Sequence, residues 1–104
     1  MTKAILIHAR DNTATLFGEA QAGEPVSIVR GSGEVVEELV ARQLIPVGHK
    51  IALKEIGEGE QIFKYGETIG VATQTIHRGE HVHVQNVVGA VFPGRPIPSS
   101  RKTG

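Results

Sequence analysis

The segment from His77 to Asn86 holds the densest group of side chains that could do chemistry. It reads His-Arg-Gly-Glu-His-Val-His-Val-Gln-Asn. On a strand, His81 and His83 would point to one face and the valines beside them to the other. Two such histidines are a common arrangement for binding a metal ion, because both imidazoles reach one ion. Solvated imidazoles on a half-buried strand give the same pattern, so both interpretations stay open.

A second candidate is the pair His49 and Lys50, which follows Gly48. A lysine ammonium group binds a carboxylate, and an imidazole donates or accepts a proton near neutral pH. The pair therefore suits an anionic substrate. A His-Lys pair also occurs on ordinary protein surfaces, so this feature alone does not establish a site.

Two further pairs are weaker candidates. Lys64 and Tyr65 precede a glycine, and both side chains could hydrogen-bond a carboxylate or hydroxyl groups. The same residues also fit a plain hairpin. Asp11 and Asn12 could bind a hydroxyl group or an ion, but such residues more often accept hydrogen bonds from nearby backbone N–H groups at a turn or cap.

Short strands separated by glycines must position these side chains. Apolar residues within 3–8 and 25–29 predict strands. Residues 30–33, which read Arg-Gly-Ser-Gly, predict a hairpin connection. Residues 34–44 fit a helix or a strand, and we favour a strand because the surrounding sequence is strand-rich and the chain has 13 glycines. Residues 13–17 fit one helical turn or a short strand equally well.

One turn pattern recurs four times. A glycine at position 23, 48, 59 or 79 is followed by two residues and then by Val or Ile. In the last three copies an Ile lies three residues before the glycine. We expect that Ile to lie in the core, the glycine to adopt a positive φ, and the Val or Ile to begin the next strand. The spacings of 25, 11 and 20 residues predict one compact all-β domain rather than a solenoid.

The composition excludes several classes of protein. Lys plus Arg and Asp plus Glu both number 11, and this zero net charge argues against a nucleic-acid-binding module. The absence of cysteine excludes disulfides, thiolate metal sites and cysteine nucleophiles. No apolar run approaches the length of a membrane span or of a signal peptide. We therefore expect a cytoplasmic protein that acts without a membrane.

The domain organisation is expected to be simple. Residues 93–104 contain three prolines and little to bury, so they predict a flexible tail or linker after a single domain at 1–92. Dinucleotide-binding glycine loops, a P-loop and a serine nucleophile elbow do not occur in the sequence. One histidine cluster in a chain of 104 residues makes an incomplete active site, because pockets usually need walls from more than one element or domain.

Four ordered motifs in this chain resemble one protein family. They are Asp11-Asn12-x-Ala14-Thr15, Ile45-Pro46-x-Gly48-His49-Lys50-Ile51-Ala52-Leu53, Lys64-Tyr65-Gly66-Glu67-x-Ile69-Gly70-x-Ala72 and Gly79-Glu80-His81-Val82-His83-Val84-x-Asn86. Together they resemble the N-terminal domain of the altronate dehydratase and galactarate dehydratase family, to which the small subunit of sulfolactate sulfo-lyase also belongs. The resemblance covers residues 3–90.

The resemblance implies a β-clip fold of the SAF type, with short strands, glycine turns and little helix. It also implies a lyase that removes water or sulfite from a hydroxy acid after taking a proton next to a carboxylate, commonly with a divalent metal such as iron. Fused members of the family carry most of the catalytic apparatus in a larger C-terminal domain. A separate large lyase subunit is therefore the implied partner of this chain.

The resemblance also implies roles for individual residues. His49 and His81 would be catalytic, and His81 and His83 would bind the metal. The carboxylate and hydroxyl groups of a sugar acid or hydroxy acid would be bound by Asp11, Asn12, Lys50, Lys64, Tyr65 and Asn86. The family often has a third histidine where this chain has Gln85, whose carbonyl oxygen is a poorer ligand than imidazole for a transition metal.

Two alternatives to the lyase interpretation remain. A β-clip domain also serves as a non-catalytic carbohydrate-binding or assembly module, which would bind a sugar by itself. An isolated domain could instead pair its exposed strand edges and form a homo-oligomer. The lyase interpretation differs from both, because it predicts a large partner and no activity from this chain alone.

Overall fold

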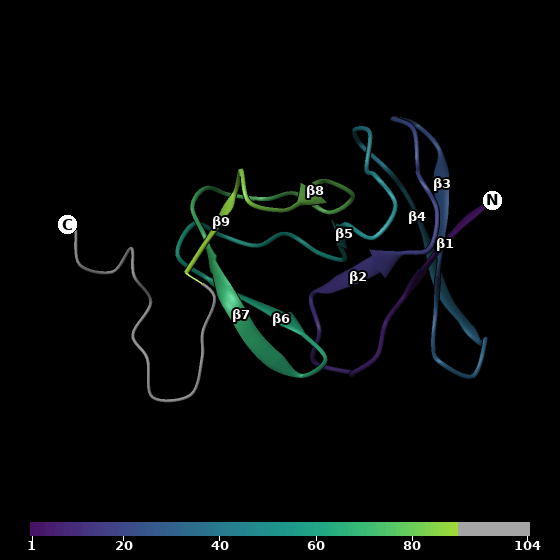
Figure 1. Cartoon of the computed structure of the whole chain (residues 1–104), viewed down its shortest axis with the longest axis horizontal. Coiled ribbons are helices and arrows are strands. Elements are labelled where there is room, and N and C mark those ends of the chain that lie inside the picture. The colour runs from purple at the N-terminus through teal and green to yellow at the C-terminus, as the bar shows by residue number, and fades with distance from the viewer. Residues whose placement is uncertain (90–104) are drawn as a thin grey trace.

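The computed structural model describes residues 1–89, and every regular element in that range is a strand (Figure 1). In chain order the strands are β1 (Thr2–Ile5), β2 (Thr13–Leu16), β3 (Pro25–Val29), β4 (Val35–Val40), β5 (Lys50–Ala52), β6 (Gln61–Lys64), β7 (Glu67–Ala72), β8 (His81–Val82) and β9 (Val87–Val88). The all-β prediction is confirmed. The predicted tail, residues 93–104, lies outside the described residues, so the domain boundary at 92 stays a prediction.

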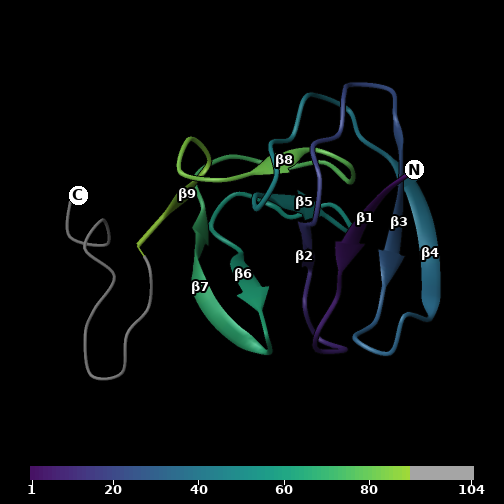
Figure 2. The ribbon, with the colours of Figure 1, turned by 45° about the vertical axis from the view of Figure 1, so that its right-hand side comes forward.

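The strands form two sheets. The larger sheet has the order β4-β3-β1-β2-β5-β8, and the smaller sheet has the order β6-β7-β9. β1 and β3 are parallel, whereas the other paired strands are antiparallel. Figure 2 shows β1 to β4 side by side at one end, the β6–β7 hairpin at the other end, and β5 and β8 between them. The short strands β5 and β8 thus lie where the two halves of the molecule meet.

Pairing decides the segments for which the sequence was ambiguous. Residues 13–17 contain β2, which is a strand because it lies between β1 and β5 and pairs with both. Residues 34–44 contain β4, which pairs with β3 as the hairpin across 30–33 predicts. No helix among the described residues is long and apolar enough to cross a membrane. The cytoplasmic location expected from the sequence stays a prediction.

Buried apolar side chains form two clusters. The first is built on the larger sheet and contains Ala4, Ala14, Leu16, Ala20, Val26, Ile28, Leu39, Ala41, Ile45, Ile51 and Leu53. The second joins the two sheets and contains Ala52, Ile56, Ile62, Ala72, Ile76 and Val82. Ile51 and Ala52 are neighbours on β5 yet belong to different clusters, because successive side chains of a strand point to opposite faces. The residues at the start of β5 therefore lie between both cores.

The repeated glycine turns have the predicted conformation. Gly23, Gly48, Gly59 and Gly79 have φ angles of 87°, 82°, 84° and 90°. The preceding isoleucines, Ile45, Ile56 and Ile76, are at most 1% exposed. The residues that enter the next strands, Val26, Ile51, Ile62 and Val82, are completely buried. The turn pattern read from the sequence is confirmed at all four positions.

The four turns associate in two similar pairs. A β-bridge between Ala20 and Ile45 joins the turns at Gly23 and Gly48, and a bridge between Ile56 and Ile76 joins those at Gly59 and Gly79. In every turn the glycine N–H donates to a carbonyl of a neighbouring strand, at Ala41, Leu16, Ala72 and Ala52 respectively. Each half of the domain is thus organised around one pair of turns.

Candidate functional site

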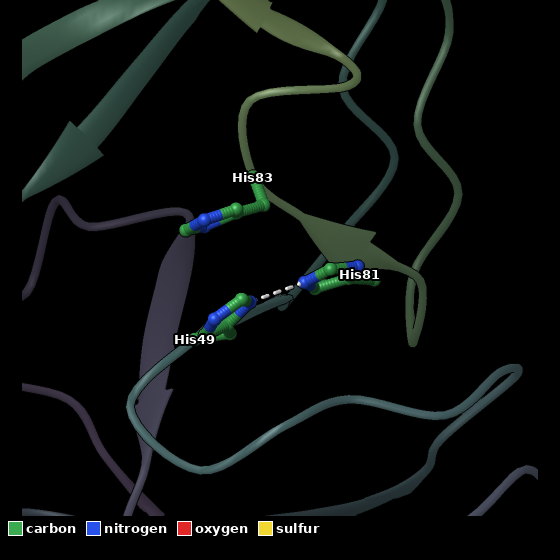
Figure 3. A group of neighbouring side chains, drawn as sticks. All are labelled: His49, His81 and His83. Carbon is green, nitrogen blue, oxygen red and sulfur yellow. Dashed lines mark hydrogen bonds between the residues drawn. The ribbon is translucent and has the colours of Figure 1, made fainter.

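Three histidines meet where β5 and β8 pair (Figure 3). His49 immediately precedes β5, His81 begins β8, and His83 follows β8. One nitrogen atom of each lies within 4.8 Å of the others. Nδ1 of His49 is 2.8 Å from Nε2 of His81, and the rings of His49 and His83 stack with their centroids 3.8 Å apart. The fold therefore joins two features that stand apart in the sequence.

The turn that carries His49 differs from the other three. In those turns the residue after the glycine is a Glu, and its carboxylate accepts the backbone N–H of the first turn residue. These pairs are Glu24 with Gln21, Glu60 with Gly57, and Glu80 with His77. The fourth turn begins with Pro46, which has no N–H to donate. His49 takes the place of the Glu, so its side chain is free to join the histidine cluster.

Asn86 holds the loop that carries the other two histidines. It is 4% exposed; its Oδ1 accepts the N–H of His83 at 3.0 Å, and its Nδ2 donates to the carbonyl of His81 at 2.7 Å. The amide oxygen of Gln43 accepts the N–H of His81 at 2.9 Å. No sequence pattern marks Gln43 as part of the site, because a glutamine in a loop has many uses. Direct substrate contact by Asn86 stays a prediction.

Gln85 contacts the cluster from outside. Its amide group lies 3.1 Å from Nδ1 of His81. The atom of Gln85 in this contact is Nε2, which donates to Nδ1 of His81, so the proton of a neutral His81 ring lies on Nε2 and faces Nδ1 of His49. Gln85 therefore favours the His81 tautomer with the proton on Nε2, and a metal ion bound at Nε2 would require that proton to leave and the Gln85 amide to turn over.

The surroundings of His81 and His83 favour their neutral forms. Burial, followed by the charges of His49, His83 and Lys50, lowers the pKa of His81. Burial, followed by the charges of His49 and Lys50, also lowers the pKa of His83. Neutral imidazole is the form that binds metal. Nδ1 of His83 is buried without a hydrogen-bond partner among the described residues, which is unusual for a polar atom unless a ligand completes it.

A cavity of about 360 Å³ lies beside the cluster. It is lined by Lys50, Ile69, His83, Val84, Val87 and Gly89. Burial, and secondly the charge of Lys64, lowers the pKa of Lys50. None of the ion pairs found within residues 1–89 includes Lys50. An ammonium group on the wall of a mostly apolar cavity suits an anionic ligand. The apolar walls Ile69 and Val87 are not among the site residues predicted from the sequence, because nothing local marks an apolar side chain as part of a cavity.

Lys64 lies near enough to Lys50 for its charge to help lower the pKa of Lys50. The carbonyl of Phe63 accepts a hydrogen bond from Oγ1 of Thr13 on β2, at 3.0 Å. Lys50 is in register with Thr15 on the same strand. Nζ of Lys64 is 5.0 Å from the centre of the Tyr65 ring. The fold thus brings the predicted substrate-binding lysines into one neighbourhood.

Asp11 and Asn12 are both buried and hold the β6–β7 hairpin. Asp11 accepts the backbone N–H groups of Tyr65 and Gly66. The amide of Asn12 donates to the carbonyl of Gln61 at 2.9 Å and accepts the N–H of Phe63 at 2.8 Å. The capping role considered from the sequence is therefore present, between distant segments. Direct substrate contact by either residue stays a prediction.

Comparison with known sequences decides the family. The family described as the altronate/galactarate dehydratase SAF domain matches residues 2–90. The chain belongs to this family. The resemblance inferred from the four motifs is confirmed, and the SAF domain, a small β fold, agrees with the all-strand structure of residues 1–89.

Individual relatives of this SAF domain are lyases. Altronate dehydratase of Bacillus subtilis is 42% identical over 86 residues, which cover 83% of this chain and 16% of that protein. Galactarate dehydratase (L-threo-forming) of Escherichia coli is 33% identical over 84 residues, or 81% of this chain and 15% of that protein. The alpha subunit of (2R)-sulfolactate sulfo-lyase of Chromohalobacter salexigens is 48% identical over 46 residues, or 44% of this chain and 49% of that subunit. The chain thus spans less than a fifth of the matched dehydratases.

Proposed function

We propose that this chain is the small subunit of a two-component hydro-lyase of the altronate and galactarate dehydratase type, or of the sulfolactate sulfo-lyase type. In this role it supplies metal- and substrate-binding residues to a large catalytic subunit. The observation that carries the proposal is the convergence of His49, His81 and His83 on one point beside the ammonium group of Lys50. Substrate, metal and partner are each part of the proposal.

The histidine cluster fits a divalent transition metal such as iron. Three neutral imidazoles are a suitable donor set for such an ion, and the buried Nδ1 of His83 lacks any other partner among the described residues. His81 and His83 would hold the ion, and the position of His49 makes it a third ligand or a neighbouring base. A bound ion would supply positive charge that stabilises the anion formed when the α-proton is removed.

The remaining residues have roles that follow from their chemistry. Lys50 binds the substrate carboxylate and offsets the negative charge that develops next to it. In a dehydration, the hydroxyl group needs a proton so that it leaves as water, and the α-proton needs an acceptor. His49 and His81 are the groups of this chain proposed for these proton transfers. Lys64 and Tyr65 contribute contacts to the carboxylate and hydroxyl groups.

The size of the relatives supports a large partner. The matched dehydratases are about six times longer than the part that this chain covers, and the matched sulfo-lyase protein is named as subunit alpha. We infer that the missing walls of the site come from a separate large subunit. The isolated chain is then inactive and gains activity only in the complex.

A pull-down tests this proposal. The chain is tagged in its native host and purified gently, and stoichiometric partners are identified by mass spectrometry. Each partner is then assayed with altronate, galactarate and sulfolactate, with and without this chain. We expect a large partner whose lyase activity depends on the chain. A chain that purifies without a partner and on which no lyase activity depends would instead support the carbohydrate-binding module.

A further inference from the structure

The turn between β6 and β7 contains an unfavourable residue. Tyr65 has a φ of 57°, in the left-handed region, and the next residue, Gly66, has a φ of 79°. Two-residue hairpin turns with positive φ at both positions usually contain Asn-Gly or Asp-Gly, because a bulky side chain rarely adopts this conformation. The ring is 54% exposed, so burial does not explain the choice of Tyr65 either.

A single carboxylate from a distant segment holds this turn. Oδ2 of Asp11 accepts the N–H of Tyr65 at 2.8 Å, and Oδ1 accepts the N–H of Gly66 at 2.6 Å. Asp11 is 8% exposed and also accepts the N–H of His8, at 3.2 Å. The ring of His8 covers Gly66 so closely that a Cβ there would lie 2.8 Å from it. The turn is thus fixed by contacts from outside the hairpin.

The turn is linked to the candidate substrate site through Lys64, whose charge helps to lower the pKa of Lys50. Nζ of Lys64 lies 5.0 Å from the centre of the Tyr65 ring. β2 connects Lys64 to Lys50. Its Thr13 donates a hydrogen bond to the carbonyl of Phe63, and its Thr15 is in register with Lys50. No ion pair found within residues 1–89 includes either lysine. Two ammonium groups therefore lie near one another, with a phenol beside Lys64 and no ion pair to either lysine within residues 1–89.

We propose that Asp11 is a positioning residue that holds Tyr65 and Lys64 as a binding arm for the carboxylate end of a polyhydroxy acid. The proposal rests on the proposed function and adds the distinction between groups that touch the ligand and a group that orients them. Tyr65 and Lys64 touch the ligand, whereas the carboxylate of Asp11 is already occupied by three backbone N–H groups. An Asn at position 65 would suit the turn better but would lose the phenol.

Tyrosine fluorescence gives a direct test, since the chain has one Tyr and no Trp. The full chain is titrated with galactarate and with adipate, which has the same carbon chain without hydroxyl groups. We expect saturable quenching or enhancement by galactarate and weaker binding of adipate. Calorimetry then compares variants that lack the tyrosine signal.

Tyr65→Asn distinguishes ligand binding by the phenol from the stability of the turn. This variant should melt about 4 °C higher, because it relieves the backbone, and should bind galactarate at least fivefold more weakly. Asp11→Asn should also weaken binding fivefold in the wild-type background but have little effect in the Tyr65→Asn background, since a positioning residue acts only through what it positions. Glu24→Gln, which removes a carboxylate that caps another turn, should leave galactarate binding unchanged.

The possible outcomes are distinct. Failure of the wild-type chain to bind galactarate removes this proposal and the substrate contact in the proposed function together. Wild-type binding that is unaffected by Tyr65→Asn overturns the binding arm and leaves the proposed function standing. An equal loss on Asp11→Asn in both backgrounds shows that Asp11 acts on the ligand directly, which overturns its positioning role.

Discussion

Nδ1 of His49 lies 2.8 Å from Nε2 of His81, although 32 residues separate the two histidines in the sequence. This hydrogen bond needs a proton on one nitrogen and a lone pair on the other, so both rings can form it while neutral. A metal ion bound by Nε2 of His81 would need the lone pair of that nitrogen, which is free only when Nε2 carries no proton. The contact therefore marks the atom at which proton and metal binding compete.

The first prediction concerns the metal ligands. His81→Ala and His83→Ala should each reduce the affinity of the full chain for Co²⁺ by about 100-fold or more, because a ligand is lost from a site with few donors. Titration followed by the visible absorption of Co²⁺ measures this. His77→Ala is the matched control, because His77 is exposed and pairs with Glu55 outside the cluster. Equal losses in all three variants would show that the binding is unspecific.

The second prediction concerns Gln85. Gln85→Ala should weaken Co²⁺ binding about tenfold, because loss of a partner that orients an imidazole typically costs this much. The tautomer of His81 in the metal-free chain can be read from its ¹⁵N shifts by NMR. We expect the wild-type ring to carry its proton on Nε2, because Nδ1 accepts from the Gln85 amide, and the variant to gain the other tautomer. An unchanged tautomer would remove the orienting role of Gln85.

The third prediction concerns pH. Burial, more than the neighbouring charges, lowers the pKa of His81 and His83 below the value near 6.5 that they have when unfolded. As the pH falls, the unfolded chain therefore takes up protons first, and the free energy of unfolding decreases below about pH 6.5. Urea unfolding at pH 7.5, 6.5 and 5.5 measures the decrease. His83→Gln should make it smaller, whereas His77→Ala should not.

The fourth prediction concerns the turn that carries His49. Pro46→Gln restores the backbone N–H that the other turns donate, and His49→Glu restores the carboxylate that accepts it. The two substitutions together should be about 1 kcal/mol more stable than the sum of the single changes, which is the typical value of a hydrogen bond. Urea unfolding of the two single variants and the double variant gives this coupling. Strict additivity would show that the turns are not equivalent.

Local patterns predicted much of the fold. The four glycine turns were predicted correctly because a positive φ at Gly and a buried residue three positions later are set by adjacent residues. The strand at 25–29 was placed at its observed bounds for the same reason. Residues 13–17 were undecided, since four residues of a strand become distinguishable from a helical turn only through their pairing partners.

The candidate site depended on contacts that no local pattern reveals. His49 meets His81 because β5 and β8 pair with Ile51 opposite His81, and this register is set by the packing of distant segments. The cap formed by Asp11 on Tyr65 joins residues 54 positions apart. A Tyr-Gly pair also lacks the usual signal for a turn with two positive φ angles. The residues of the candidate site could therefore be identified from the sequence, but the contacts between them could not.

The paired glycine turns have a consequence for how such a site can arise. A scaffold that uses the same device four times has redundancy, so one copy can exchange its structural carboxylate for an imidazole while three copies still hold the fold. The turn with Pro46 and His49 differs from the other three in this way. The repetition thus gives the domain evolvability. One turn can lose the stability of its Glu contact and carry a new side chain, while the other three turns still stabilise the fold.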